Sequence, residues 1–96
     1  MPASQLLQFG SSLSIREVGE YAAQLRTLLD KGPVELDLRG VGSIDTAGLQ
    51  LLLAAASAAE RRGFRLKLHG AQAVQTGAAR SLGLEQQLCS LTEIVP

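Results

Sequence analysis

The sequence predicts a single α/β domain over residues 1–96, with a mixed, mostly parallel sheet of four to five strands and helices mainly on one face. Two segments, residues 34–38 and 64–69, alternate strictly between apolar and polar residues, as half-buried strands do. The residues between them read as a helix, and strand–helix–strand order is typical of parallel neighbours. Because a sheet covered on both faces has continuous apolar strands, the alternation predicts one uncovered face.

The first third of the chain is expected to form an edge strand and a helix. Residues 5–9 are an apolar stretch, and residues 11–14 form a second extended piece. From Ile15 the apolar residues recur at steps of three and four, which predicts an amphipathic helix capped by Ser14 with Glu17 in a capping box. The inner stripe of this helix is Ile15, Val18, Ala22, Leu25 and Leu29.

The polar faces of the two alternating strands carry opposite charges. Glu35 and Asp37 on one strand would lie near Arg65 and Lys67 on the other, on the wet face of the sheet. Two carboxylates can also serve acid–base catalysis, but beside basic neighbours on an open surface we favour solvated ion pairs. All four side chains are therefore expected to be exposed.

The remaining elements follow from the same periodicities. A helix over residues 46–62 ends at a glycine, and a third helix covers residues 71–82. A short helical turn at residues 84–88 and a last strand at residues 91–95 complete the domain.

Composition and charge exclude several classes of function. Nine basic and nine acidic residues cancel and are scattered, so we expect no binding to nucleic acid and no insertion into membranes. Three aromatic residues are too few for a stacking platform. A lone cysteine, Cys89, is expected to fill core space. Since no segment is long enough to span a bilayer, we expect a cytoplasmic, bacterial protein.

The residues that catalysis needs are also missing. The chain has one histidine, one cysteine and no glycine-lysine phosphate loop, and His69 follows the alternation of its strand onto the wet face. We therefore expect no enzymatic activity, no metal and no cofactor. A nucleotide at the turn of residues 40–48 is a minor alternative, because helix N-termini attract phosphate. Arg39 is the one basic residue beside that turn.

The same turn is the most informative segment for function. It follows the carboxyl end of a parallel strand, where ligands and partners usually bind. Asp45 can accept hydrogen bonds from the free N–H groups of the next helix, which places Thr46 at its first position with the hydroxyl outward. From these residues alone, the alternative is that both serve only to start the helix.

Residues 37–53 read D-L-R-G-V-G-S-I-D-T-A-G-L-Q-L-L-L, which resembles the signature of STAS domains. That signature has a strand, a turn with Asp-Ser/Thr-Ser/Ala-Gly-Leu and an apolar helix. The order of the elements, E-R-R-G-F-R-L-K-L at residues 60–68 and S-L-G-L at residues 81–84 fit the same family. The resemblance therefore covers almost the whole chain.

This resemblance implies a non-catalytic regulatory module that binds other proteins. In anti-sigma-factor antagonists a partner kinase phosphorylates the hydroxyl after the aspartate and so releases the complex; the matching residue is Thr46. The D-T-A-G turn is more similar to the small STAS subunit of the Mla lipid-transport ATPase complex, whose threonine contacts the ATPase, and to STAS proteins of chemotaxis systems. The implied partners are a serine kinase or anti-sigma factor, an ABC ATPase subunit, or a chemotaxis component.

The long helix independently favours a docking surface, because it is apolar on two sides. Its sheet-facing side carries Leu49, Leu52, Leu53, Ala56 and Ala59. Its opposite side carries Ala47, Leu51, Ala54, Ala55 and Ala58. The alternatives to a partner are exposed alanines that only raise helix propensity, or a symmetric homodimer. With Thr46 as the phosphorylation or switch residue, the predicted partner-binding residues are Ser43, Asp45, Thr46, Ala47, Gly48, Gln50, Leu51, Ala54 and Ala58.

Overall fold

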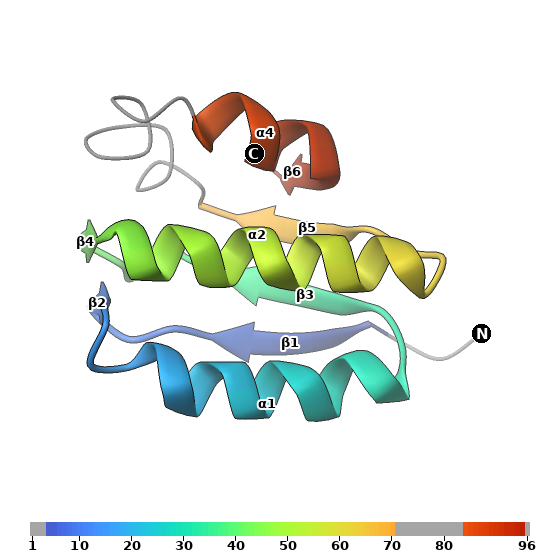
Figure 1. The fold of residues 1–96 in the computed structure, drawn as a ribbon, viewed down its shortest axis with the longest axis horizontal. Coiled ribbons are helices and arrows are strands. Elements are labelled where there is room, and N and C mark those ends of the chain that lie inside the picture. The colour runs from blue at the N-terminus through green and yellow to red at the C-terminus, as the bar shows by residue number, and fades with distance from the viewer. Residues whose placement is uncertain (1–3, 71–83, 96) are drawn as a thin grey trace.

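The computed structural model describes residues 4–70 and 84–95, which form a four-stranded sheet in the order β1-β3-β5-β6 (Figure 1). Its strands are β1 (Gln5–Gln8), β3 (Val34–Asp37), β5 (Leu66–His69) and β6 (Thr92–Val95). All three pairings in this sheet are parallel. The short strands β2 (Ser12–Leu13) and β4 (Ser43–Ile44) pair in a separate two-stranded sheet. The predicted fold class is confirmed.

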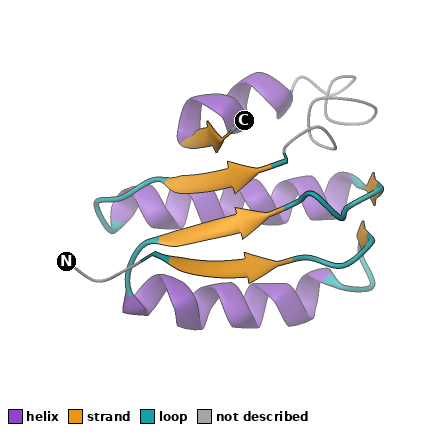
Figure 2. Ribbon diagram, turned by 180° about the vertical axis from the view of Figure 1, so that it is seen from behind, coloured by secondary structure: helices purple, strands orange, loops and turns teal. Residues whose placement is uncertain are grey.

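The two long helices lie on one face of the sheet. Helices α1 (Val18–Lys31) and α2 (Thr46–Arg61) run side by side, and both begin at the end of the molecule where β2 and β4 lie (Figure 1). Helix α4 (Leu84–Leu91) packs against α2 and β6. Seen from behind, the strands lie in front of α1 and α2 (Figure 2). Within the described ranges the other face has no helix over it, as the alternation predicted.

The hydrophobic core lies between the sheet and the two long helices. Leu36 and Leu68 from the sheet, and Leu49 and Leu52 from α2, are at most 1% exposed. Leu25 of α1 is 2% exposed and packs into the same cluster. Truncation of one such leucine to alanine costs about 2–5 kcal/mol, because its contacts are lost and a cavity remains. The apolar residues of the alternating strands and those of the helices therefore pack into one core.

The first helix begins later than its periodicity predicted. The N-cap position is Glu17 and the helix starts at Val18. Ser14 is not its cap, since the Ser14 hydroxyl donates to the Glu17 carboxylate at 2.8 Å. Ile15 is 69% exposed and does not belong to the inner stripe. The physical reason is that the Ile15 N–H donates to the carboxylate of Asp45, which holds the preceding turn against the start of α2.

The predicted exposed face is wrong at Asp37, which is 3% exposed. One Asp37 oxygen accepts from the backbone N–H and Nε–H of Arg39, and the other pairs with its Nη2, all at 2.9 Å. Glu35 and Lys67 are half-buried and lie opposite each other in register, whereas Arg65 is exposed. Because β3 is a central strand with neighbours on both sides, a side chain as short as that of Asp37 is shielded.

The C-terminal elements agree with the predictions where the structure describes them. The short helical turn is α4, which extends to Leu91, and the last strand begins at Thr92. The Thr92 hydroxyl donates to the Leu88 carbonyl at 2.7 Å, which joins the end of the helix to the strand. The helix predicted at residues 71–82 and the side chain of Cys89 lie outside the described parts of the structure.

Candidate functional site

One carboxylate organises the turn before α2. The Oδ1 atom of Asp45 accepts from the backbone N–H of Gly48 at 2.9 Å, and Oδ2 accepts from the N–H of Ile15 at 3.0 Å. These backbone donors, that of Gly48 first, lower the pKa of Asp45 because they stabilise its charged form. The predicted N-cap is therefore present, and it also ties α2 to the segment before α1, a connection that the sequence pattern did not indicate.

Gly48 is required because α2 approaches β2 closely. A Cβ atom at this position would collide with the carbonyl oxygen of Leu13 and lie 2.9 Å from Cγ1 of Ile44. Gly48 is buried, so it lies behind the predicted partner-binding surface and not on it. Its contribution to that surface is to allow the close contact that positions its neighbours.

Thr46 is the first residue of α2 and its side chain is exposed. Ser43 in β4 is exposed as well, and Ala47 is half-buried. The backbone N–H groups at a helix start and the helix dipole favour negative charge there. A phosphate or carboxylate on the Thr46 position would therefore find a favourable local environment in the free protein.

The other predicted partner-binding residues of α2 fall into two groups. Gln50 and Ala54 are exposed, whereas Leu51 and Ala58 are half-buried. Ala55 is 5% exposed, so its predicted outward position is wrong. Because α1 packs along this side of α2, part of the second apolar side is covered by the chain itself.

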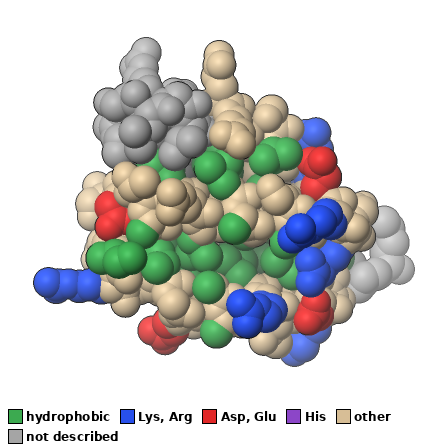
Figure 3. All heavy atoms as spheres, viewed as in Figure 1, with side chains coloured by type: hydrophobic (Ala, Val, Ile, Leu, Met, Phe, Trp, Pro, Cys, Tyr) green, Lys and Arg blue, Asp and Glu red, His purple; other side chains and the backbone are tan. Residues whose placement is uncertain are grey.

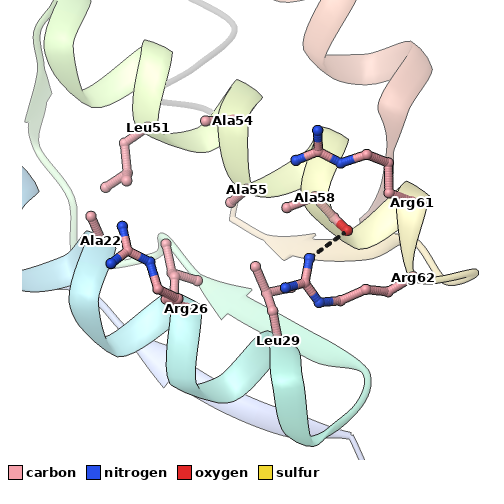
Figure 4. A pocket seen from close by; sticks show the side chains of 10 residues that line it. Ala22, Arg26, Leu29, Leu51, Ala54, Ala55, Ala58, Arg61 and Arg62 are labelled. Carbon is pink, nitrogen blue, oxygen red and sulfur yellow. Dashed lines mark hydrogen bonds between the residues drawn. The ribbon is translucent and has the colours of Figure 1, made fainter.

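A groove that sequence reasoning missed lies between α1 and α2. In the space-filling view, hydrophobic side chains form a band between the two helices, with most of the nearby Lys and Arg side chains toward its right-hand end (Figure 3). One hollow in it has a volume of about 330 Å³, and the close-up shows residues from both helices around it (Figure 4). Its lining includes Ala22, Arg26 and Leu29 of α1 with Leu51, Ala58 and Arg61 of α2. Only the pairing of two helices distant in sequence creates it.

The one histidine takes part in a polar pair on the uncovered face of the sheet. His69 Nε2 lies 2.6 Å from Glu35 Oε1, and their side chains are 25% and 26% exposed. The hydrogen bond from His69 lowers the pKa of Glu35. The two residues are diagonal neighbours on adjacent strands, an arrangement that stabilises a sheet modestly.

Three further observations concern nucleotide, metal and membrane sites. Arg39, which precedes the turn in the sequence, pairs with Asp37 through Nε and Nη2, so part of its charge is already neutralised. Among the residues that the structure describes, no three His, Cys, Asp or Glu side chains gather as a metal site. In those same parts of the chain, every helix is too short or too polar to cross a membrane.

Solved structures of other proteins share this fold. A candidate anti-sigma factor antagonist from Thermotoga maritima has a TM-score of 0.67 at 20% identity, over 93% of this chain and 77% of that one. A sulfate transporter family protein from Wolinella succinogenes has a TM-score of 0.70 at 23% identity, over 95% and 75% of the two chains. No curated protein matches the chain significantly. At these identities the structural likeness concerns the fold alone.

The family assignment comes from the sequence match. The family model described as "Mlab, STAS domain" matches residues 2–95, which include every described strand and helix and the turn capped by Asp45. The resemblance seen in the D-T-A-G turn is thus confirmed over nearly the full length, and the chain belongs to the STAS domain family.

Proposed function

We propose that this STAS domain is a non-catalytic regulatory module that binds a partner protein through the turn before α2 and the outer side of that helix. The observation that carries the proposal is the exposed Thr46 at the capped start of that helix. We call the following set the docking surface: Ser43, Asp45, Thr46, Ala47, Gln50, Leu51, Ala54 and Ala58. The likeness of the fold to a candidate anti-sigma factor antagonist supports a regulatory role.

A change of the Thr46 side chain should alter partner binding without altering the fold. Asp45 holds the turn through bonds to two backbone N–H groups, so the geometry does not depend on the Thr46 side chain. Next to Thr46 the surface becomes apolar, with the half-buried Ala47 and Leu51. A partner that covers this region would have to desolvate any charge introduced at Thr46, which costs binding energy. The free domain has no such cost.

In the kinase-controlled form of the proposal, a serine/threonine kinase phosphorylates Thr46. The hydroxyl oxygen attacks the γ-phosphorus of ATP, its proton passes to a base of the kinase, and ADP leaves. The new phosphate interacts favourably with the positive end of α2 in the free domain. The partner is then released because the phosphate would have to be desolvated in the interface, and not because the domain unfolds.

A second candidate is a subunit that docks on an ABC-type ATPase without phosphorylation. The match to the Mlab-type family model favours it, as does Ala47, which stands where sporulation-type proteins have a second serine. In this form the Thr46 hydroxyl is a contact in a lasting interface. Loss of that contact, and not addition of charge, is what weakens the complex.

The two forms are separated by three variants of the full chain. Thr46→Glu, Thr46→Ala and the control Thr27→Glu, at an exposed position of α1, are titrated against candidate partners from neighbouring genes: an anti-sigma factor or kinase, an ATPase subunit, and a chemotaxis component. We expect Thr46→Glu to weaken binding about tenfold or more, and Thr27→Glu to leave it unchanged. If Thr46 is a phosphorylation switch, Thr46→Ala should still bind the partner. If the Thr46 hydroxyl is a contact in the interface, Thr46→Ala should bind the partner more weakly. Undiminished binding of Thr46→Glu to a partner that binds the native chain would contradict the proposal.

A further inference from the structure

The groove between α1 and α2 overlaps the docking surface along α2. The hollow of about 330 Å³ shares Ala22 and Leu51 with a second hollow of about 350 Å³ nearer the start of both helices. Together their linings run along α2 from Ala47 to Arg61. At about 1.5 Å per residue, that is a groove about 20 Å long, or roughly four helical turns.

The groove is apolar and has room because its walls are built from small side chains. Ala22 of α1 lies opposite Leu51, and Ala54 and Ala58 follow along α2; none of the three alanines reaches far from its backbone. Leu25 and Leu29, which are 2% and 5% exposed, lie below them. Two helices that pack side by side with alanines along their shared edge can accept the side chains of a third helix between them.

Three arginines line the hollow: Arg26 lies beside Ala22, whereas Arg61 and Arg62 lie near the end of α2 (Figure 4). Arg62 is satisfied by Asp30 at 2.8 Å and by the Ala58 carbonyl at 3.1 Å. Arg26 and Arg61 take part in no ion pair within the described residues, and both are exposed beside the apolar strip (Figure 4). The linings of the two hollows contain no acidic residue.

We propose that this groove binds an amphipathic helix of the partner protein, with its apolar stripe along Ala22, Leu51 and Ala58 and acidic side chains beside Arg26 and Arg61. The inference rests on the proposed function, because the groove extends from the docking surface. It follows the helix-in-groove mode, in which apolar anchors supply affinity and charges set the orientation. A second copy of this chain fits less well, because its groove has no acidic residue that could pair with Arg26 and Arg61 of the first copy.

The test uses helical peptides of about 15 residues, the length that the groove accommodates. Apolar residues form one stripe, and the positions beside it are randomised among Glu, Gln and Lys. Display selection against the native protein should enrich Glu at the peptide positions that lie beside Arg26 and Arg61. A selected peptide should shift the NMR resonances of Ala22, Leu51, Ala54 and Ala58.

Charge reversal makes the test specific. The double variant Arg26→Glu/Arg61→Glu should bind the acidic peptide about tenfold more weakly or worse, and a peptide with Lys for Glu should regain that affinity. The control Arg65→Glu, at an exposed position outside the groove, should change nothing. Because the exchanged side chains are exposed, thermal unfolding should confirm that the double variant stays folded.

Several outcomes would overturn the inference. They are selection of Lys-rich peptides, resonance shifts confined to the uncovered face of the sheet, or equal affinity of the double variant. Light scattering that shows a dimer of the native chain, lost in the double variant, would make a second copy the occupant. Thr46→Glu should leave peptide affinity within about twofold, since Thr46 does not line the groove. A negative result with the peptides therefore contradicts the groove proposal, whereas undiminished partner binding of Thr46→Glu contradicts the docking-surface proposal.

Discussion

The carboxylate of Asp45 accepts a hydrogen bond from the backbone N–H of Ile15 at 3.0 Å, although 30 positions separate the two residues. Its other oxygen accepts from the first turn of α2. One side chain therefore fixes both the start of α2 and the turn that leads into α1. The exposed Thr46 comes directly after this junction, so the candidate switch is placed on a braced part of the fold.

Replacement of Asp45 tests this brace. Asp45→Ala removes a helix cap and an acceptor for Ile15, and we expect the melting temperature to fall by about 4–8 °C. Asp45→Asn keeps one acceptor oxygen and should lose less. The matched control is Glu60→Ala, an exposed position of the same helix, which should change stability by less than about 0.5 kcal/mol. Equal melting temperatures for Asp45→Ala and Glu60→Ala would show that the brace is unimportant.

A pair of glycine substitutions tests the close approach of α2 to β2. Gly48→Ala should destabilise the domain by about 1–3 kcal/mol, because the added Cβ meets the Leu13 carbonyl. Gly19→Ala in α1 has open space at the same atom and should stabilise by on the order of 0.5 kcal/mol through helix propensity. Urea unfolding of both variants measures the difference. Similar effects of the same sign at the two sites would contradict the described packing.

Thr46 substitutions should leave the free domain stable. Thr46→Glu places a carboxylate at the start of α2, where the helix dipole contributes about 0.3–1 kcal/mol of stabilisation at low salt. Added salt should reduce this gain, because exposed charges are screened. Chemical unfolding at two salt concentrations measures the effect, with Thr46→Gln as the neutral control. A cooperative loss of structure in Thr46→Glu would mean that this side chain belongs to the fold and not to a surface.

The Asp37–Arg39 pair predicts a specific dependence on acid. Hydrogen bonds from the Arg39 side chain are the main reason that the pKa of Asp37 is lowered from 3.8 to about 2. A lowered pKa means that the unfolded chain binds the proton more readily, so this stabilisation is present above pH 3.8 and is lost as the pH falls through about 2. Arg39→Ala should therefore be less stable than the native chain near neutral pH, and the difference should shrink below pH 3.8.

Unfolding curves across this pH range, with Arg65→Ala as the control, measure that difference. Arg65 is exposed and takes part in no ion pair in the described parts of the chain, so its substitution should give a difference that does not vary with pH. If the difference between Arg39→Ala and the native chain were constant with pH, Asp37 would not owe its lowered pKa to Arg39.

Much of the fold could be predicted because it follows from local rules. Strict alternation over residues 34–38 and 64–69 marks strands with one buried face, and steps of three and four mark helices. The N-cap at Asp45 was predictable because the carboxylate and the Gly48 N–H lie within one helical turn. The family resemblance of the D-T-A-G turn rests on the same short segment.

The errors share a cause, which is that burial depends on distant elements. Alternation placed Asp37 on the uncovered face, but the two strands beside β3 and the side chain of Arg39 shield it. Periodicity placed Ala55 on the outer side of α2, but α1 covers it. Ile15 fitted the stripe of the first helix, but a bond to Asp45 holds it in the turn before that helix.

The sequence by itself thus determined the order of the four strands of the main sheet and of helices α1, α2 and α4, the capped start of α2 and the exposed place of Thr46, because each depends on residues within a few positions of one another. Only the tertiary structure decided which polar residues are buried and how the groove between α1 and α2 is formed. The physical reason is that solvent exclusion and the packing of helices are set by neighbours in space, and no periodicity within one segment specifies them.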